Sequence, residues 1–269
     1  MARISNEIRM NRRLKFGVEI EFNNDVRHEI ASILNSRGVR CYVKGYTHEI
    51  MDSWKIVIDS TCGYEIVSPI LYDFHELEIV CETMVRVGAK VDFKCGLHVH
   101  HDANDLSVEN IKNVYRLYNK YEKAIDSVMP VSRRKSNSRW CQPVTDGWLD
   151  KVESCDSISD MKSQLANNSP RSGLRYKKLN FCSYLSYGTL EFRQHSGTTN
   201  FEKIKNWVLV TNIMLQRSSE EKKVKPLTDK RCQLWIEKEL AMMYDLYKEL
   251  GLNGTVLSNH LRNRKKACA

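Results

Sequence analysis

Residues 15–23 read KFGVEIEFN, and the alternation of polar and apolar side chains in this stretch predicts a β-strand. Successive side chains of a strand point to opposite faces of a sheet, so Glu19 and Glu21 share one face and the apolar side chains take the other. A solvent-facing strand usually carries Thr, Ser, Lys and mixed charges rather than two carboxylates. The pattern therefore indicates a sheet whose polar face holds a functional site.

Three further stretches repeat this period-two pattern, each beside a glycine. They are GYEIVSP (63–69), CGLHVHH (95–101) and GTLEFRQHS (188–196). The polar residues on a shared face are His98 with His100 and Glu191 with Arg193, while Glu65 stands alone and His101 is expected on the opposite face. If these polar faces converge, at least four carboxylates and two imidazoles meet in one cavity.

A cluster of this kind favours a divalent cation. Like charges at close range are costly and shift pKa values unless a cation compensates them. Carboxylate oxygens with one imidazole suit Mg²⁺ or Mn²⁺, which commonly bridge to phosphates. A structural zinc site would recruit Cys95 with the histidines, but we interpret Cys95 as a small buried side chain.

Helical periodicity separates these strands, and the sequence as a whole predicts an α+β protein with an antiparallel sheet. The expected helices cover 25–38, 74–90 and 106–129, the last with Ser107 as its N-cap.

The second half of the chain is less regular. We interpret 130–175 as a long loop with a short helix near 156–166, and 179–196 as two strands joined by a tight turn at SYG. From Asn200 onward the chain is expected to be helical, with a basic tail that frays.

The net charge of +9 suits an anionic partner such as nucleic acid or a phosphate. Much of the excess lies in two clusters, for which a solvated surface is the simpler interpretation: Arg133, Arg134, Lys135 and Arg139, and Arg262, Arg264, Lys265 and Lys266.

Nine cysteines without a CxxC pair indicate reduced thiols. With no signal peptide and no apolar run of roughly 20 residues, the sequence predicts a cytoplasmic protein.

Taken in order, FGVEIEF, GYEIVSPI, CGLHVHH, RYKKLNF and GTLEFRQHSGT resemble the motif series of the putative amidoligase family. The resemblance covers roughly residues 15–200 and implies a carboxylate–amine ligase with a glutamine synthetase-like catalytic fold. In such a fold a curved antiparallel sheet surrounds ATP and Mg²⁺ (or Mn²⁺). It implies a single catalytic domain over residues 1–269, with the ligase core in 15–200 and a helical part in 200–269.

The resemblance also implies roles for individual residues. The implied metal ligands are Glu19, Glu21, Glu65, His98 and Glu191. The implied nucleotide contacts are His100, Lys178, Asn180 and Arg193, and the implied catalytic residues are Arg193, Glu65 and Arg175. Only Glu65 stands where glutamine synthetase itself uses two glutamates, and Asp59 is expected to compensate in part.

In this family ATP phosphorylates a carboxylate, and an amine attacks the acyl phosphate to form an amide or isopeptide bond. The expected partners are therefore a small-molecule or peptide carboxylate and an amine, which the sequence does not identify. Two other functions fit the residues. HVHHD (98–102) could be the core of a zinc or manganese hydrolase, or the basic clusters could bind nucleic acid on a ligase-like scaffold.

Overall fold

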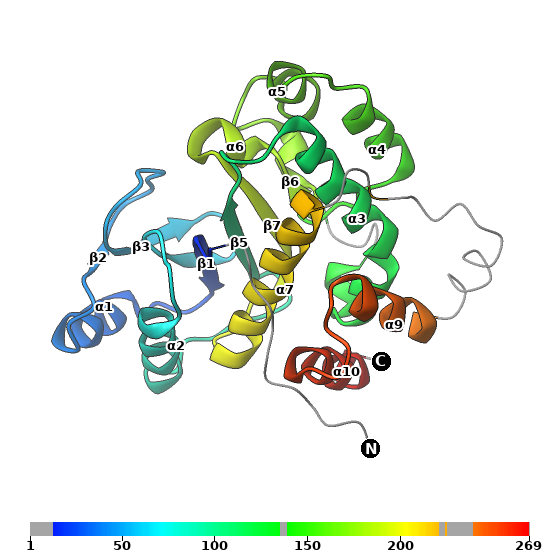
Figure 1. Ribbon diagram of the computed structural model, residues 1–269. Coiled ribbons are helices and arrows are strands. Elements are labelled where there is room, and N and C mark those ends of the chain that lie inside the picture. The colour runs from blue at the N-terminus through cyan, green and yellow to red at the C-terminus, as the bar shows by residue number, and fades with distance from the viewer. Residues whose placement is uncertain (1–12, 135–138, 221–223, 225–238, 269) are drawn as a thin grey trace. The chain divides into compact units, whose positions relative to one another are not determined.

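The structure is a computed structural model that describes residues 13–134, 139–220, 224 and 239–268 (Figure 1). The chain divides into two compact units, each assembled from segments that are not consecutive. The sheet unit consists of Arg13–His101 and Arg193–Leu209, and the helical unit includes Asp102–Phe192 and the described part of Val210–Ala269. The predicted α+β class is confirmed, whereas the single catalytic domain stays a prediction.

In the sheet unit the strands follow the hydrogen-bonded order β2-β3-β4-β1-β5-β7. The bounds are β1 Phe16–Phe22, β2 Cys41–Val43, β3 Trp54–Asp59, β4 Gly63–Val67, β5 Gly96–Asp102 and β7 Thr189–Ser196. β1 pairs antiparallel with β4 and β5, β3 pairs antiparallel with β4, and β2 runs parallel to β3. In the helical unit, β6 (Leu179–Asn180) pairs antiparallel with the first half of β7. The sheet is thus mostly antiparallel, as predicted.

The helices of the sheet unit are α1 (Arg27–Ser36) and α2 (His75–Arg86). Those of the helical unit are α3 (Val108–Ser127), α4 (Asp146–Glu153), α5 (Ile158–Ala166), α6 (Cys182–Tyr187), α9 (Glu239–Glu249) and α10 (Val256–Cys268), with short 3-10 helices at Val131–Arg133 and Gly173–Tyr176. α7 (Phe201–Glu220) begins in the sheet unit and ends in the helical unit. None of the helices in the described parts of the chain combines the length and the apolar stretch that crossing a bilayer requires.

The apolar face of the sheet forms the core of the sheet unit. It carries buried aliphatic side chains from neighbouring strands, namely Val18, Ile20, Ile56, Ile66, Leu97 and Val99. α2 joins this face at its N-terminus, where the rings of Phe16 and Phe74 lie 5.3 Å apart and Trp54 Nε1 donates to Glu76. α1 packs against α2 and β2 (Figure 1). Because one face of the sheet is used in this packing, its other face is left to the polar side chains.

Ser107 is the predicted N-cap of the long helix α3, and the structure confirms it. Its hydroxyl accepts a hydrogen bond from the amide of Asn110, whose side chain accepts one from the Ser107 amide. This reciprocal capping box satisfies two of the amide groups that a helix leaves without partners in its first turn.

Replacing Ser107 with alanine is expected to lower the free energy of unfolding by about 1 kcal/mol, because the amide of Asn110 loses its acceptor. Ser107→Asp is the matched control, since its carboxylate can accept the same hydrogen bond and suits a helix N-terminus. Urea unfolding followed by circular dichroism measures both. An aspartate variant as unstable as the alanine variant would contradict the capping role.

The two strands predicted over 179–196 are present as β6 and β7, but β6 is only two residues long and the connection is not the tight turn that was predicted. Residues 182–187 form the short helix α6, which ends at Gly188 with a φ of 64°. The Asn180 side chain accepts a hydrogen bond from the amide of Cys182, the first residue of the helix. A glycine in the left-handed region then terminates it, as is common for helices. The aromatic residues that suggested a strand instead stack on one another, with Phe181 and Tyr184 5.1 Å apart.

Two further predictions need correction. The loop expected over 130–175 contains not only α5, as predicted, but also α4, whose N-cap Thr145 accepts from the amide of Trp148. The basic tail expected to fray is the helix α10. Both helices are short and polar, so their periodicity in the sequence is weak.

The interpretation of the basic clusters as solvated surface is wrong for three arginines. Arg133 is buried, Arg134 Nε donates to the carbonyl of Met129 (2.8 Å), and Arg264 Nε donates to that of Val128 (2.9 Å). Burial lowers the pKa of Arg264. Part of the positive charge therefore makes contacts inside the helical unit itself, and the nucleic-acid partner stays a prediction. Lys135 lies outside the described residues.

Candidate active site

Strand pairing in the sheet unit places four of the predicted metal ligands in two adjacent rows. Glu19 on β1 lies opposite His98 on β5, and Glu21 lies opposite Glu65 on β4. Directly opposed residues of antiparallel strands point to the same face, so all four side chains project from one side of the sheet. The predicted convergence of these side chains is therefore what the structure shows.

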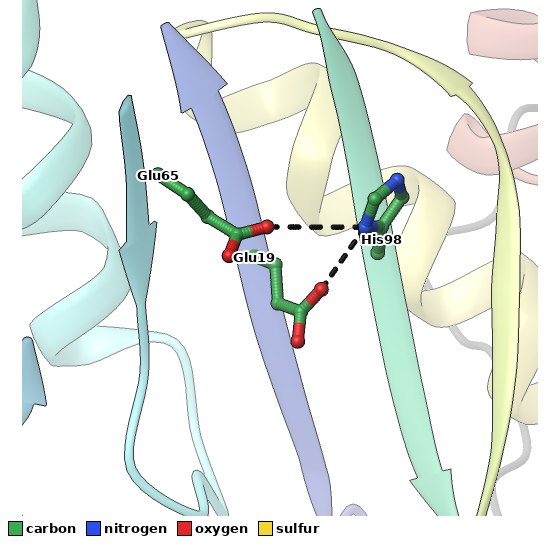
Figure 2. A group of neighbouring side chains, drawn as sticks. All are labelled: Glu19, Glu65 and His98. Atoms are coloured by element: carbon green, nitrogen blue, oxygen red, sulfur yellow. Dashed lines mark hydrogen bonds and ion pairs between the residues drawn. The ribbon is translucent and has the colours of Figure 1, made fainter. Parts of the chain in front are cut away.

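His98 lies at the centre of this group. Its Nδ1 is 3.0 Å from Glu19 Oε2 and 4.0 Å from Glu65 Oε1, and its Nε2 is 3.5 Å from Glu21 Oε1. Figure 2 shows Glu19, Glu65 and His98 reaching toward one another from three neighbouring strands. One buried imidazole thus lies within 4.0 Å of three carboxylates.

The two other histidines of CGLHVHH take opposite faces. His100 lies opposite Gly17 on the polar face, and its Nε2 is 3.3 Å from Glu19 Oε1. His101 lies opposite Phe16, on the apolar face, and is buried. The predicted split of the histidines is confirmed, whereas the nucleotide contact of His100 stays a prediction.

The like charges of the cluster act most strongly on Glu65. Burial, followed by the negative charges of Glu19, Glu21 and Asp59, raises the pKa of Glu65 well above its ordinary value, although Arg193 acts in the opposite direction. The neighbouring carboxylates therefore disfavour a further negative charge on Glu65. A bound divalent cation would compensate this charge.

Glu19 responds differently to the same environment. Burial acts to raise its pKa, but the positive charge and hydrogen bonds of His100 and His98 outweigh burial and hold the pKa well below its ordinary value. The same environment therefore lowers the pKa of Glu19 while it raises that of Glu65. The opposite shifts of Glu19 and Glu65 are typical of functional sites.

The residues present fit a hard divalent cation. Glu19, Glu65 and His98 each offer one ligand atom, and these atoms lie within 4.8 Å of one another. Two carboxylate oxygens and one imidazole nitrogen suit Mg²⁺ or Mn²⁺, which prefer oxygen ligands. Cys95 is not part of this group, and it is buried as predicted.

Two other predicted site residues meet in the helical unit. Asn180 lies opposite Glu191 across β6 and β7, and its Nδ2 donates to Glu191 Oε2 at 2.6 Å. Both side chains are buried. Arg193, two residues further along β7, belongs to the sheet unit. The metal-ligand role of Glu191 stays a prediction, as do the nucleotide contacts of Asn180 and Arg193.

The remaining residues of RYKKLN make contacts within the helical unit. Lys178 is fully buried, and its Nζ lies 2.6 Å from Glu122 and 2.5 Å from Asp126, both on α3. Arg175 donates through Nη2 to the hydroxyl of Tyr176 at 2.8 Å. The nucleotide role of Lys178 and the catalytic role of Arg175 stay predictions.

Lys55 was missed by the sequence analysis. It lies on β3 opposite Val67, and Glu19 lies opposite Val67 from the other side, so Lys55 shares the face of the cluster. Its ammonium donates to the carbonyl of Glu49, and burial lowers its pKa although Glu19 and Glu65 act to raise it. The alternation in WKIVID placed Lys55 on one face, but nothing in it indicated which face.

Comparison with known proteins identifies the class. A family model described as "Putative amidoligase enzyme" matches residues 12–214, which is most of the chain. The chain therefore belongs to this amidoligase family, as its motifs suggested, and the description of the family is that of an enzyme that forms amide bonds, a ligase. No curated protein matches the chain.

Proposed function

We propose that the chain is an ATP- and Mg²⁺-dependent carboxylate–amine ligase that forms an amide or isopeptide bond through an acyl phosphate. The observation that carries the proposal is the group of Glu19, Glu65 and His98, with ligand atoms within 4.8 Å of one another in a member of the amidoligase family. A glutamine synthetase-like catalytic fold and a single catalytic domain are parts of the same proposal.

In this proposal the carboxylates of Glu19, Glu21 and Glu65, together with His98, hold Mg²⁺ (or Mn²⁺). The roles predicted for the other site residues are kept, namely those of His100, Lys178, Asn180, Glu191 and Arg175. The cation, when bound, neutralises charge on the phosphates of ATP. Arg193 would stabilise the transferring phosphoryl group, for which a guanidinium is well suited because of its fixed charge and planar donors.

The proposed reaction has two consecutive steps. The γ-phosphoryl group passes to an oxygen of the substrate carboxylate, and ADP leaves. The amine nitrogen then attacks the acyl carbon, loses a proton, and expels inorganic phosphate. Because phosphoryl transfer depends mostly on positioning and charge neutralisation, a sheet face that holds Glu19, Glu65 and His98 close together supports the first step.

The hydrolase alternative is less well supported. HVHHD would need its histidines to act together, but His101 lies on the face opposite to His98 and His100. Catalytic zinc sites commonly use several imidazoles around one ion, whereas here both polar-face histidines are directed at Glu19. The carboxylate-rich composition of the cluster favours the ligase.

The proposal is tested by incubating the chain with ATP, Mg²⁺ and pooled amino acids and amines. We expect ADP release that depends on one acid–amine pair, with the amide product detected by mass spectrometry. Glu65→Gln should abolish this release, because it removes a carboxylate from the cluster. Glu29→Gln, on the exposed surface of α1, is the matched control. Bound zinc without affinity for nucleotide would contradict the ligase.

A further inference from the structure

The connection between β2 and β3 is unusual for so short a segment. The two strands are consecutive in the chain and run parallel, so residues 44–53 have to run back along the strands from the end of β2 to the start of β3. Every residue of this crossover is described, and none belongs to a helix or a strand. In Figure 1 the crossover arches over β2 and β3, on the side opposite to α1 and α2.

Lys55 shows which face of the sheet the crossover covers. Its side chain shares the face of the carboxylate–histidine cluster, and its Nζ donates to the carbonyl oxygens of Glu49 and Thr47, both in the crossover. Trp54, the preceding residue, takes the opposite face, where it contacts α2. Lys55 is only 5% exposed. The crossover therefore lies over the polar face and packs against the lysine.

One row of side chains on the polar face links the crossover to the cluster. From the edge strand β2 to β5, the residues in register are Tyr42, Lys55, Val67, Glu19 and His98. Opposed side chains of antiparallel neighbours lie about 5 Å apart at Cβ, so Val67 is the immediate neighbour of Glu19. Val67 is partly exposed and Tyr42 is 47% exposed. Accessible apolar surface thus lies directly beside a carboxylate of the cluster.

The crossover carries further exposed apolar side chains. Tyr46 and Ile50 are both exposed. The Tyr46 hydroxyl lies 2.8 Å from Nε2 of His48, and the two rings are 4.9 Å apart, edge to face, so the tyrosine ring has a fixed neighbour. Exposed apolar side chains that gather in one region commonly mark a binding surface. Here they gather at the end of the polar face formed by β2, β3 and β4.

We propose that Tyr42, Val67 and the crossover form a subsite for an apolar group of one ligase substrate, and that Lys55 is a positioning residue that holds the crossover in place. The inference rests on the proposed ligase function, because it names the kind of substrate on which the cluster would act. An amino acid or amine with an aliphatic or aromatic side chain fits this subsite. A charged side chain would lose hydration against Val67 and Tyr42 without gaining a partner there.

The substrate class is tested by comparing ADP release with two pools of amino acids and amines, one with apolar and one with charged side chains. We expect release with the apolar pool to be about 10-fold faster or more. Tyr42→Ala and Val67→Thr should each raise the KM for the active apolar compound about 10-fold with little change in kcat, because they remove a binding contact. Tyr72→Ala is the matched control, since Tyr72 is 50% exposed but lies outside the strands.

The positioning role of Lys55 is tested with Glu-C protease, which cleaves after Glu49 in the crossover. Lys55→Met loses two hydrogen bonds to the crossover, so cleavage at this position should be about 10-fold faster. The same variant should raise the KM for the apolar compound and leave the Mn²⁺ affinity of the cluster unchanged. Lys55→Arg keeps the donors and should restore both properties. Lys90→Met, at an exposed lysine of the same unit, is the control.

A measurement without ATP separates this inference from the ligase. Saturation-transfer NMR of the same two pools with the full chain should show contact with apolar members, and Tyr42→Ala should abolish it. Such contact without ADP release from either pool would contradict the ligase and leave the subsite in place. Equal ADP release with both pools, or a KM that neither Tyr42→Ala nor Val67→Thr changes, would overturn the subsite and leave the ligase intact.

Two further results would count against the inference. Absence of NMR contact with either pool would overturn the subsite. Cleavage after Glu49 that is no faster in Lys55→Met than in the wild type would overturn the positioning role of Lys55.

Discussion

Replacing Glu19 with glutamine is expected to weaken Mn²⁺ binding by about 100-fold or more and to abolish ADP release by the proposed ligase. Glutamine has nearly the same shape but no charge. The substitution therefore removes an anionic ligand atom from the group with Glu65 and His98 while leaving the packing of β1 in place.

The size of this effect follows from the contacts of Glu19. Its carboxylate lies 3.0 Å from His98 and 3.3 Å from His100, so the substitution removes one charged partner from each imidazole of the polar face. Its pKa is held well below the ordinary value, whereas the pKa of Glu65 is raised, so Glu19 is the better anionic ligand of the two. Glu19 is thus linked to both histidines of the polar face.

Electron paramagnetic resonance of Mn²⁺ measures the binding, because the free ion gives a sharp signal that is lost on binding to protein. Glu29→Gln on the exposed surface of α1 should bind as wild type does. Unchanged Mn²⁺ affinity in Glu19→Gln would exclude this cluster as the metal site. Lost affinity with full ADP release would show instead that the cation is not required.

Much of the cluster was predictable because strand alternation is a local property. The pattern in FGVEIEF places Glu19 and Glu21 on one face whatever the neighbouring strands are. Register is not local. A shift of two residues between β1 and β5 would keep every side chain on its face but would move His98 away from Glu19, to a position opposite Gly17 or Glu21. The sequence could therefore indicate which side chains share a face. Only the fold shows that Glu19 lies opposite His98 and that Glu21 lies opposite Glu65.

Other errors arose where tertiary contacts outweigh local pattern. The first of the two strands expected over 179–196 ends at Asn180, because residues 182–187 form a helix whose first amide bonds the Asn180 side chain and which ends at Gly188. Lys55 gave no signal, because a single lysine in an apolar strand does not show that carboxylates lie on the neighbouring strands. The sequence analysis assigned Lys178 to the nucleotide from its motif alone. It could not show the carboxylates that contact this lysine, because they lie 52 and 56 positions earlier in the chain.

Replacing Lys178 with methionine is expected to lower the free energy of unfolding by about 3–5 kcal/mol, because it leaves two buried carboxylates without their cation. The Nζ of Lys178 contacts both Glu122 and Asp126 on α3, and the lysine has no solvent exposure. Methionine has a similar length and suits a buried site, so the loss reports the missing charge rather than a cavity. Chemical denaturation of the full chain, followed by circular dichroism, measures it.

The matched variant combines Lys178→Met with Glu122→Gln and Asp126→Asn, and should recover much of the lost stability, because removing a buried charge together with its partners is far less costly than orphaning them. The carboxylate of Glu122 accepts a hydrogen bond from the amide of Val144, and the carbonyl oxygen of the substituted side chain can accept the same bond.

Burial already raises the pKa of Glu122 against the opposing effect of Lys178. Since a raised pKa makes the folded state bind protons more tightly, the deficit of Lys178→Met should shrink as the pH falls toward that pKa. A variant of normal stability that had lost only nucleotide binding would instead assign Lys178 to the nucleotide, as its motif predicts.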